Sequence, residues 1–82
     1  MMQYRVIFYN RSTDRVGGLI DIPGNLVPQV LALAGIQNAN DLGEYPLDAT
    51  QVRDIAMLIG FKPDLSRFVY HLEPTGQIPL RA

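Results

Sequence analysis

A helix with both of its ends marked lies between Leu47 and Phe61, and it constrains the fold more than any other stretch of this chain. Asp48 is a residue type that caps helices, and Gln51, three positions later, completes a capping box. Gly60 stands where a left-handed residue would close the last turn. Between these ends an apolar stripe recurs at helical spacing, formed by Val52, Ile55, Ala56 and Ile59. The pattern predicts an amphipathic helix, with Met57 on its exposed side.

The N-terminal part of the chain is typical of a β-hairpin. From Gln3 to Tyr9, β-branched and aromatic residues dominate, and side chains on both faces of the expected strand are apolar. One face would carry Tyr4, Val6 and Phe8, and the other Arg5, Ile7 and Tyr9. A second strand, Val16 to Ile22, would place Leu19 and Asp21 opposite Ile20 and Ile22. Gly17 and Gly18 indicate a bulge or a close approach at its start.

A second helix is expected after the hairpin. Pro23 and Gly24 fit the middle of a type II turn, and Asn25 can cap a helix that continues to about Gly35. If Val27 resists the helical region because it precedes a proline, the helix starts at Pro28 instead. Gln29 is the one side chain in this stretch that clearly prefers water. A helix that is apolar on nearly every side must be covered on nearly every side, which indicates a central place against the sheet or a partner surface.

Two readings of the stretch from Leu65 to Glu73 compete. As a strand, Arg67 to Leu72 would align Phe68, Tyr70 and Leu72 on one face. As a helix, the stretch would begin at Asp64 and end before Pro74. We favour the strand, because Phe, Val, Tyr and His in succession form poor helix.

Composition sets limits on size and on the kind of partner. A chain of 82 residues is expected to form one domain, over residues 1–74, followed by a tail over 75–82. Hydrophobic residues make up 48% and charged residues 18%, a low charged share for a soluble domain. The net charge of −1 disfavours electrostatic binding of nucleic acid or membrane through the whole surface. The absence of cysteine, and an N-terminus without a signal-like apolar run, favour a cytoplasmic location.

The residues that carry chemistry form no convincing catalytic or metal site in the sequence. His71, the one histidine, has Ser66 nearby, but a strand would direct the two to opposite faces. The oxygen ligands Asn38, Asn40, Asp41 and Glu44 do not have the spacing of a calcium loop. Arg11 and Arg15 could hold an anion at the hairpin tip, although a solvated loop is the simpler interpretation. We therefore expect no catalytic residues, no metal and no cofactor.

The sequence as a whole predicts a small α+β domain in the order strand, strand, helix, helix, strand, with both helices packed on one face of an antiparallel sheet. The excess of apolar side chains favours a non-enzymatic interaction module, either a homodimer or a domain with a protein partner. Its contacts would come from the second face of the strands and from Val30, Leu31, Leu33 and Met57. The alternative is a helix-turn-helix DNA-binding regulator, which requires a helix from Leu65 to Glu73 and would contact nucleic acid through Ser66, Arg67, Tyr70 and His71.

Overall fold

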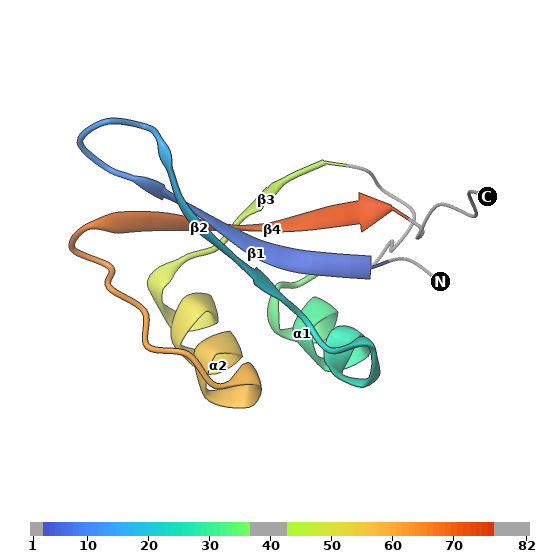
Figure 1. Ribbon diagram of the computed structural model, residues 1–82. Coiled ribbons are helices and arrows are strands. Elements are labelled where there is room, and N and C mark those ends of the chain that lie inside the picture. The colour runs from blue at the N-terminus through green and yellow to red at the C-terminus, as the bar shows by residue number, and fades with distance from the viewer. Residues whose placement is uncertain (1–2, 37–42, 77–82) are drawn as a thin grey trace.

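The computed structural model describes residues 3–36 and 43–76. The elements are β1 (Gln3–Asn10), β2 (Val16–Asp21), a short 3₁₀ helix η1 (Gly24–Leu26), α1 (Val27–Leu33), β3 (Tyr45–Pro46), α2 (Ala49–Ile59) and β4 (Phe68–Gly76). The strands form one sheet in the order β2-β1-β4-β3, with every neighbouring pair antiparallel. Both helices lie on the same face of this sheet (Figure 1). The predicted α+β architecture and element order are confirmed.

The helix α2 begins and ends as its sequence predicts. The Asp48 carboxylate accepts a hydrogen bond from the Gln51 backbone N–H at 2.8 Å, and the Gln51 side chain accepts one from the Asp48 N–H at 2.9 Å. Gly60 adopts the left-handed conformation, with φ 86° and ψ 57°. Val52, Ile55 and Ala56 are buried, whereas Met57 is 85% exposed. Local capping therefore orients the apolar stripe of α2 toward the sheet.

The predicted type II turn and the Asn25 cap are wrong. Gly24 belongs to η1 rather than to a type II turn, because its φ is not positive and the Leu26 N–H donates to the Pro23 carbonyl at 2.9 Å. The helix α1 then begins at Val27, which is helical although it precedes Pro28. The 3₁₀ turn replaces the expected Asn25 cap, since neither η1 nor α1 has a side-chain cap.

The core lies between the sheet and the helices. It joins alternate side chains of the strands to the buried stripes of the two helices, and its members are Tyr4, Val6, Ile22, Val27, Val30, Val52, Ile55, Tyr70 and Leu72. An aromatic cluster extends this core at one end, where the Phe8 ring lies 5.0 Å from that of Phe68 and 5.1 Å from that of Tyr70, centroid to centroid. Burial of one face of β1 and β2 confirms the alternation that the sequence predicts.

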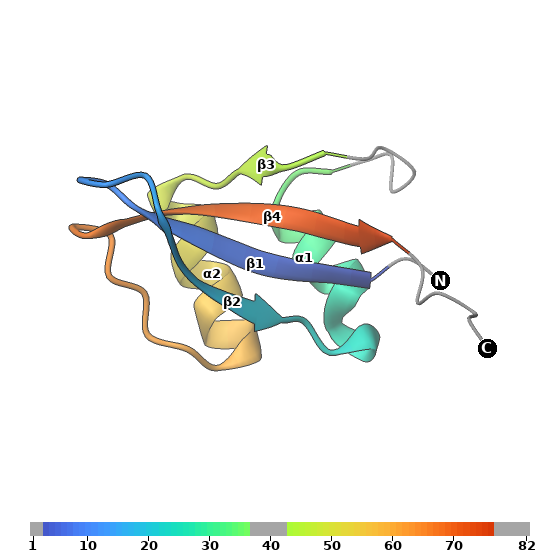
Figure 2. The same ribbon diagram turned by 45° about the horizontal axis from the view of Figure 1, so that its top comes forward.

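The strand that the sequence favours after α2 is also confirmed, although it covers Phe68–Gly76 and not Arg67 to Leu72. The strand β4 pairs with β1 over its whole length, from Asn10 opposite Phe68 to Gln3 opposite Gly76. Because this pairing continues past Pro74, Thr75 and Gly76 belong to the strand and not to the tail; residues 77–82 lie outside the described residues. The short strand β3, which the sequence analysis missed, lies on the other side of β4 (Figure 2).

Candidate functional site

One face of the sheet is covered by α1 and α2, and no described helix covers the other (Figures 1 and 2). We call this second surface the open face. Residues directly opposite each other in an antiparallel pair share a face, so the strand register identifies its members. They are Arg5, Ile7 and Tyr9 of β1, Val16, Leu19 and Asp21 of β2, and Val69, His71 and Glu73 of β4.

The open face has an apolar side over β1 and β2. Ile7 lies opposite Leu19 on one neighbouring strand and His71 on the other, and these surroundings reduce its exposure to 6%. Leu19 itself is 50% exposed and Val16 is 56% exposed. Two of the four exposed large apolar side chains in the described residues therefore lie on one strand of the open face.

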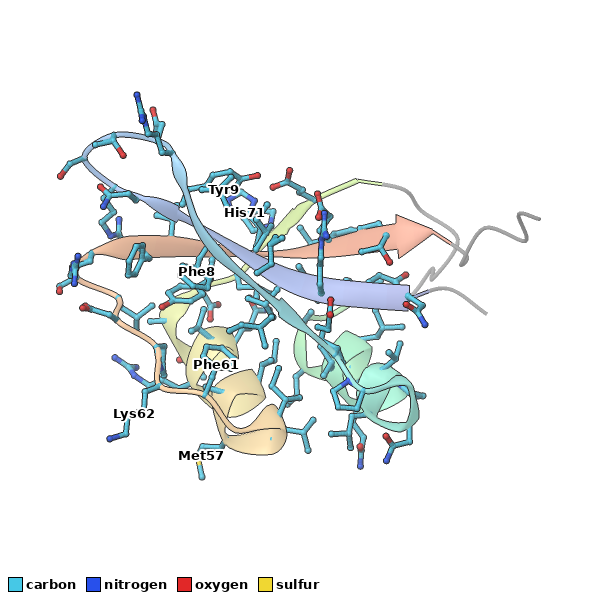
Figure 3. The ribbon with its side chains drawn as sticks, viewed as in Figure 1. Phe8, Tyr9, Met57, Phe61, Lys62 and His71 are labelled. Atoms are coloured by element: carbon cyan, nitrogen blue, oxygen red, sulfur yellow. The ribbon has the colours of Figure 1, made fainter. Side chains whose placement is uncertain are left out.

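The other side of the open face carries a polar cluster of Tyr9, Glu44 and His71. The Tyr9 hydroxyl lies 3.0 Å from each carboxylate oxygen of Glu44, to which it donates. The rings of Tyr9 and His71 meet edge to face with centroids 5.5 Å apart (Figure 3). His71 Nδ1 is buried, makes no hydrogen bond and lies 3.2 Å from Glu44 Oε1. Partial desolvation raises the pKa of the Tyr9 phenol, and the nearby Glu44 carboxylate raises it further.

A charged pair lies at the opposite end of the open face. Arg5 Nε donates to Glu73 Oε2 at 2.6 Å, across directly paired positions of β1 and β4. Their side chains remain 33% and 22% exposed, so this partly solvated pair contributes little to stability. The exposed apolar area of the open face is therefore that of Val16 and Leu19.

The residues predicted for a partner interface do not form one surface. Val30 is completely buried in the core of its own chain, so its assignment to an interface is wrong; it packs inward because it lies on the stripe of α1 that faces the sheet. Leu31 is half-buried against the same core. Leu33 and Met57 are exposed on the helix layer, at 36% and 85%.

The recognition helix that the DNA-binding alternative requires is not formed. The segment that would form it is a turn followed by β4, whose alternation places Tyr70 and Leu72 in the core while its backbone pairs with β1. Tyr70 is 4% exposed, and its hydroxyl accepts the Asp64 N–H at 2.8 Å. Ser66 and Arg67 lie in the turn, where Ser66 Oγ donates to Asp64 Oδ1 at 2.6 Å. His71 faces Tyr9 and Glu44 instead, so these four residues share no surface.

The two arginines predicted as an anion contact have different surroundings. Arg11 Nε donates to the Leu65 carbonyl at 2.9 Å, and the Arg11 N–H donates to the Arg67 carbonyl at the same distance. Arg11 thus ties the hairpin tip to the turn before β4. Arg15 is exposed at the start of β2. Within residues 3–36 and 43–76, no group of three or more acidic, histidine or cysteine side chains could hold a metal. Asn38, Asn40 and Asp41 lie outside the described residues.

A family model matches the chain from Gln3 to Glu73, which spans every described element from β1 into β4. The chain belongs to this family. Its description is a domain of unknown function, DUF7683. Comparison with curated proteins and with solved structures found no match. None of the helices in the described residues is both long enough and apolar enough to cross a lipid bilayer.

Several residues of the open face could be predicted as a set, but Glu44 could not. The alternation of β1 and β2 places Arg5, Ile7, Tyr9, Leu19 and Asp21 on one face. Glu44 reaches this face through the bridge between Tyr45 and Leu72, which joins segments 27 positions apart. A two-residue strand carries no periodic signal, so nothing local predicts this contact.

Proposed function

We propose that this domain is a non-enzymatic interaction module that associates with a second copy of itself through the open face. The observation that carries the proposal is the pair of exposed apolar residues Val16 and Leu19 beside the buried Ile7, on a sheet face that the described helices leave uncovered. Exposed apolar side chains on one face of a sheet are a feature of protein interaction surfaces. The low charged share of the sequence, 18%, supports the same proposal.

The expected contribution of Leu19 to the free energy of dimerisation follows from its exposed fraction. Full burial of a leucine side chain stabilises by roughly 2 kcal/mol, so covering the exposed half contributes about 1 kcal/mol. A twofold contact contains two copies of Leu19, and the combined contribution is therefore about 2 kcal/mol, or roughly 30-fold in the dissociation constant. A lysine at position 19 would add two further costs to that loss: electrostatic repulsion between the two copies and desolvation of the lysine charge.

The test is the molecular mass in solution, measured by sedimentation equilibrium over micromolar to high micromolar concentrations. We expect a concentration-dependent dimer that Leu19→Lys weakens at least ~30-fold. Met57→Lys is the matched control, because Met57 is the most exposed apolar residue but lies on the helix layer. A wild-type monomer at high micromolar concentration would refute self-association. A dimer that is weakened by Met57→Lys and not by Leu19→Lys would refute the open face as its contact.

A further inference from the structure

The contact between His71 and Glu44 on the open face changes its charge near neutral pH. His71 is the only histidine of the chain, and its Nδ1 lies 3.2 Å from Glu44 Oε1 without a hydrogen bond. A neutral imidazole with its lone pair on Nδ1 sets two acceptors against each other there, whereas a protonated ring presents an N–H and a positive charge. Histidine ordinarily titrates between pH 5 and 8. Protonation of His71 therefore converts the contact into an ion pair.

The other groups around His71 keep their charge in this pH range. The titratable or charged side chains that face it come from β1, from the residue before β3 and from β4, and they are Tyr9, Arg5, Glu44 and Glu73. The pKa of the Tyr9 phenol is raised above 10, so the phenol stays neutral. Carboxylates ordinarily titrate near pH 4 and guanidinium groups above pH 12. Between pH 7.5 and 5.5 the charge of this group therefore changes at His71.

The open face carries an excess of negative charge when His71 is neutral. Among its described residues one cation, Arg5, stands against three carboxylates, those of Asp21, Glu44 and Glu73, which leaves a net charge of −2. Two copies stacked through their open faces bring these charges together, and like charges repel. Protonation of His71 halves the net charge of each face to −1.

Covering the open face also removes water from Glu44. The side chains of His71 and Glu44 are 28% and 37% exposed in the single chain. A carboxylate that loses its water is costly unless a cation or further hydrogen bonds compensate. The Tyr9 hydroxyl supplies a neutral hydrogen bond, and protonated His71 supplies the cation. Repulsion between the faces and desolvation of Glu44 therefore both favour a protonated His71 in the stacked pair.

We propose that self-association through the open face takes up protons at His71 of both copies and is therefore stronger at pH 5.5 than at pH 7.5. The inference rests on the proposed self-association and adds its regulation. The apolar contact of Val16 and Leu19 acts at either pH, and the contact between His71 and Glu44 adjusts its strength. A group that binds its proton more tightly in the associated state strengthens association as the pH falls.

The size of the effect follows from charge and spacing. Two unit charges on sheets stacked about 10 Å apart repel in water by the equivalent of roughly 2-fold in an equilibrium constant. Reducing both faces from −2 to −1 removes three of four such repulsions, so the dimer should become up to ~8-fold tighter at low salt. Screening at physiological salt should reduce this change to about 2-fold.

Sedimentation equilibrium at pH 7.5 and 5.5, at low and at physiological salt, tests the proposal with the wild-type protein and His71→Gln. The wild-type dimer is expected to tighten several-fold at pH 5.5. The His71→Gln dimer should change by less than about 1.5-fold, because glutamine can donate to Glu44 but does not titrate. Dilution calorimetry of the wild-type protein in two buffers of different ionisation enthalpy should show proton uptake on association.

The outcomes separate this inference from the proposed function. A wild-type monomer at both pH values up to high micromolar concentration overturns both. A wild-type dimer with the same dissociation constant at both pH values, and with no proton uptake, overturns the regulation and leaves self-association standing. A full pH response in His71→Gln overturns the role of His71.

A charge-neutral variant tests the repulsion between faces at a single pH. Asp21→Asn reduces the net charge of the open face to −1 without a proton, so at pH 7.5 and low salt its dimer should be up to ~8-fold tighter than that of the wild type. Asp54→Asn is the matched control, because it changes the net charge of the chain equally but lies exposed on α2. If Asp54→Asn tightens the dimer as much as Asp21→Asn, the charge of the open face is not the cause.

Discussion

Gly18 is a position where one added methyl group should destabilise the domain measurably. A Cβ at Gly18 would lie 2.5 Å from Phe8 Cζ and 3.0 Å from Phe8 Cε1. The Phe8 ring cannot easily withdraw, because the rings of Phe68 and Tyr70 lie 5.0 and 5.1 Å away. Overpacking of this kind costs about 1 to 3 kcal/mol. The loss of glycine flexibility in the unfolded chain offsets about 0.4 to 1 kcal/mol of that cost.

The midpoints of these two ranges leave a net loss for Gly18→Ala of roughly 1.3 kcal/mol. This corresponds to a fall in Tm of about 5 to 10 °C for a domain of this size. Thermal unfolding followed by circular dichroism measures it, at one low protein concentration because association adds stability. Gly24→Ala is the matched control: nothing lies within 4 Å of its Cβ position and its φ is not positive. We expect its Tm to stay the same or rise slightly.

A second substitution identifies Phe8 as the cause. Phe8→Leu removes the ring atoms that the new methyl group would meet, so Gly18→Ala should cost less than half as much in that background. The argument is refuted if Gly18→Ala melts at or above the temperature of Gly24→Ala, or if its cost is the same with and without Phe8→Leu.

Three further predictions concern α2 and the open face. Ile55→Ala, at a fully buried position, should lower the free energy of unfolding by about 2 to 5 kcal/mol in urea titrations, whereas Met57→Ala, at an 85% exposed position, should change it by under about 0.5 kcal/mol. Asp48→Ala removes the capping box and should cost about 0.5 to 2 kcal/mol, most of which Asp48→Ser should recover. The Tyr9 phenol should titrate above pH 10 by NMR, and Glu44→Gln should move its pKa back toward 10. Because the folded state holds this proton more tightly than the unfolded chain, the stability linked to Tyr9 is fully present below pH 10 and is lost as pH rises from 10 through the raised pKa of the folded state.

Elements with local signals could be predicted from the sequence. The start of α2 depends on Asp48 and Gln51, three residues apart, and its end depends on the single residue Gly60. The faces of β1 and β2 follow from alternation along a few residues. In each case the residues that decide the conformation are close in the chain, so the sequence pattern alone is enough to predict the element.

Features that depend on distant partners could not be predicted in the same way. The segment from Leu65 to Glu73 fits two patterns, and pairing with β1, more than 55 positions earlier, decides between them. The polar cluster requires Tyr9, Glu44 and His71 to meet from three separate segments. The turn at Gly24 could not be predicted because Pro-Gly is compatible with two kinds of turn, and the structure has the 3₁₀ form.

The pairing of the first strand with the last also sets the order in which the molecule can assemble. The contact between Asn10 and Phe68 closes most of the chain into a loop, whereas the β1–β2 hairpin and α2 require only neighbouring residues. Closing a long loop costs conformational entropy before its contacts return any energy, which makes this step the slow one. A nascent chain on the ribosome would therefore contain the β1–β2 hairpin and α2 without a complete core until β4 has emerged from the exit tunnel. Only then could β4 pair with β1 and complete the core.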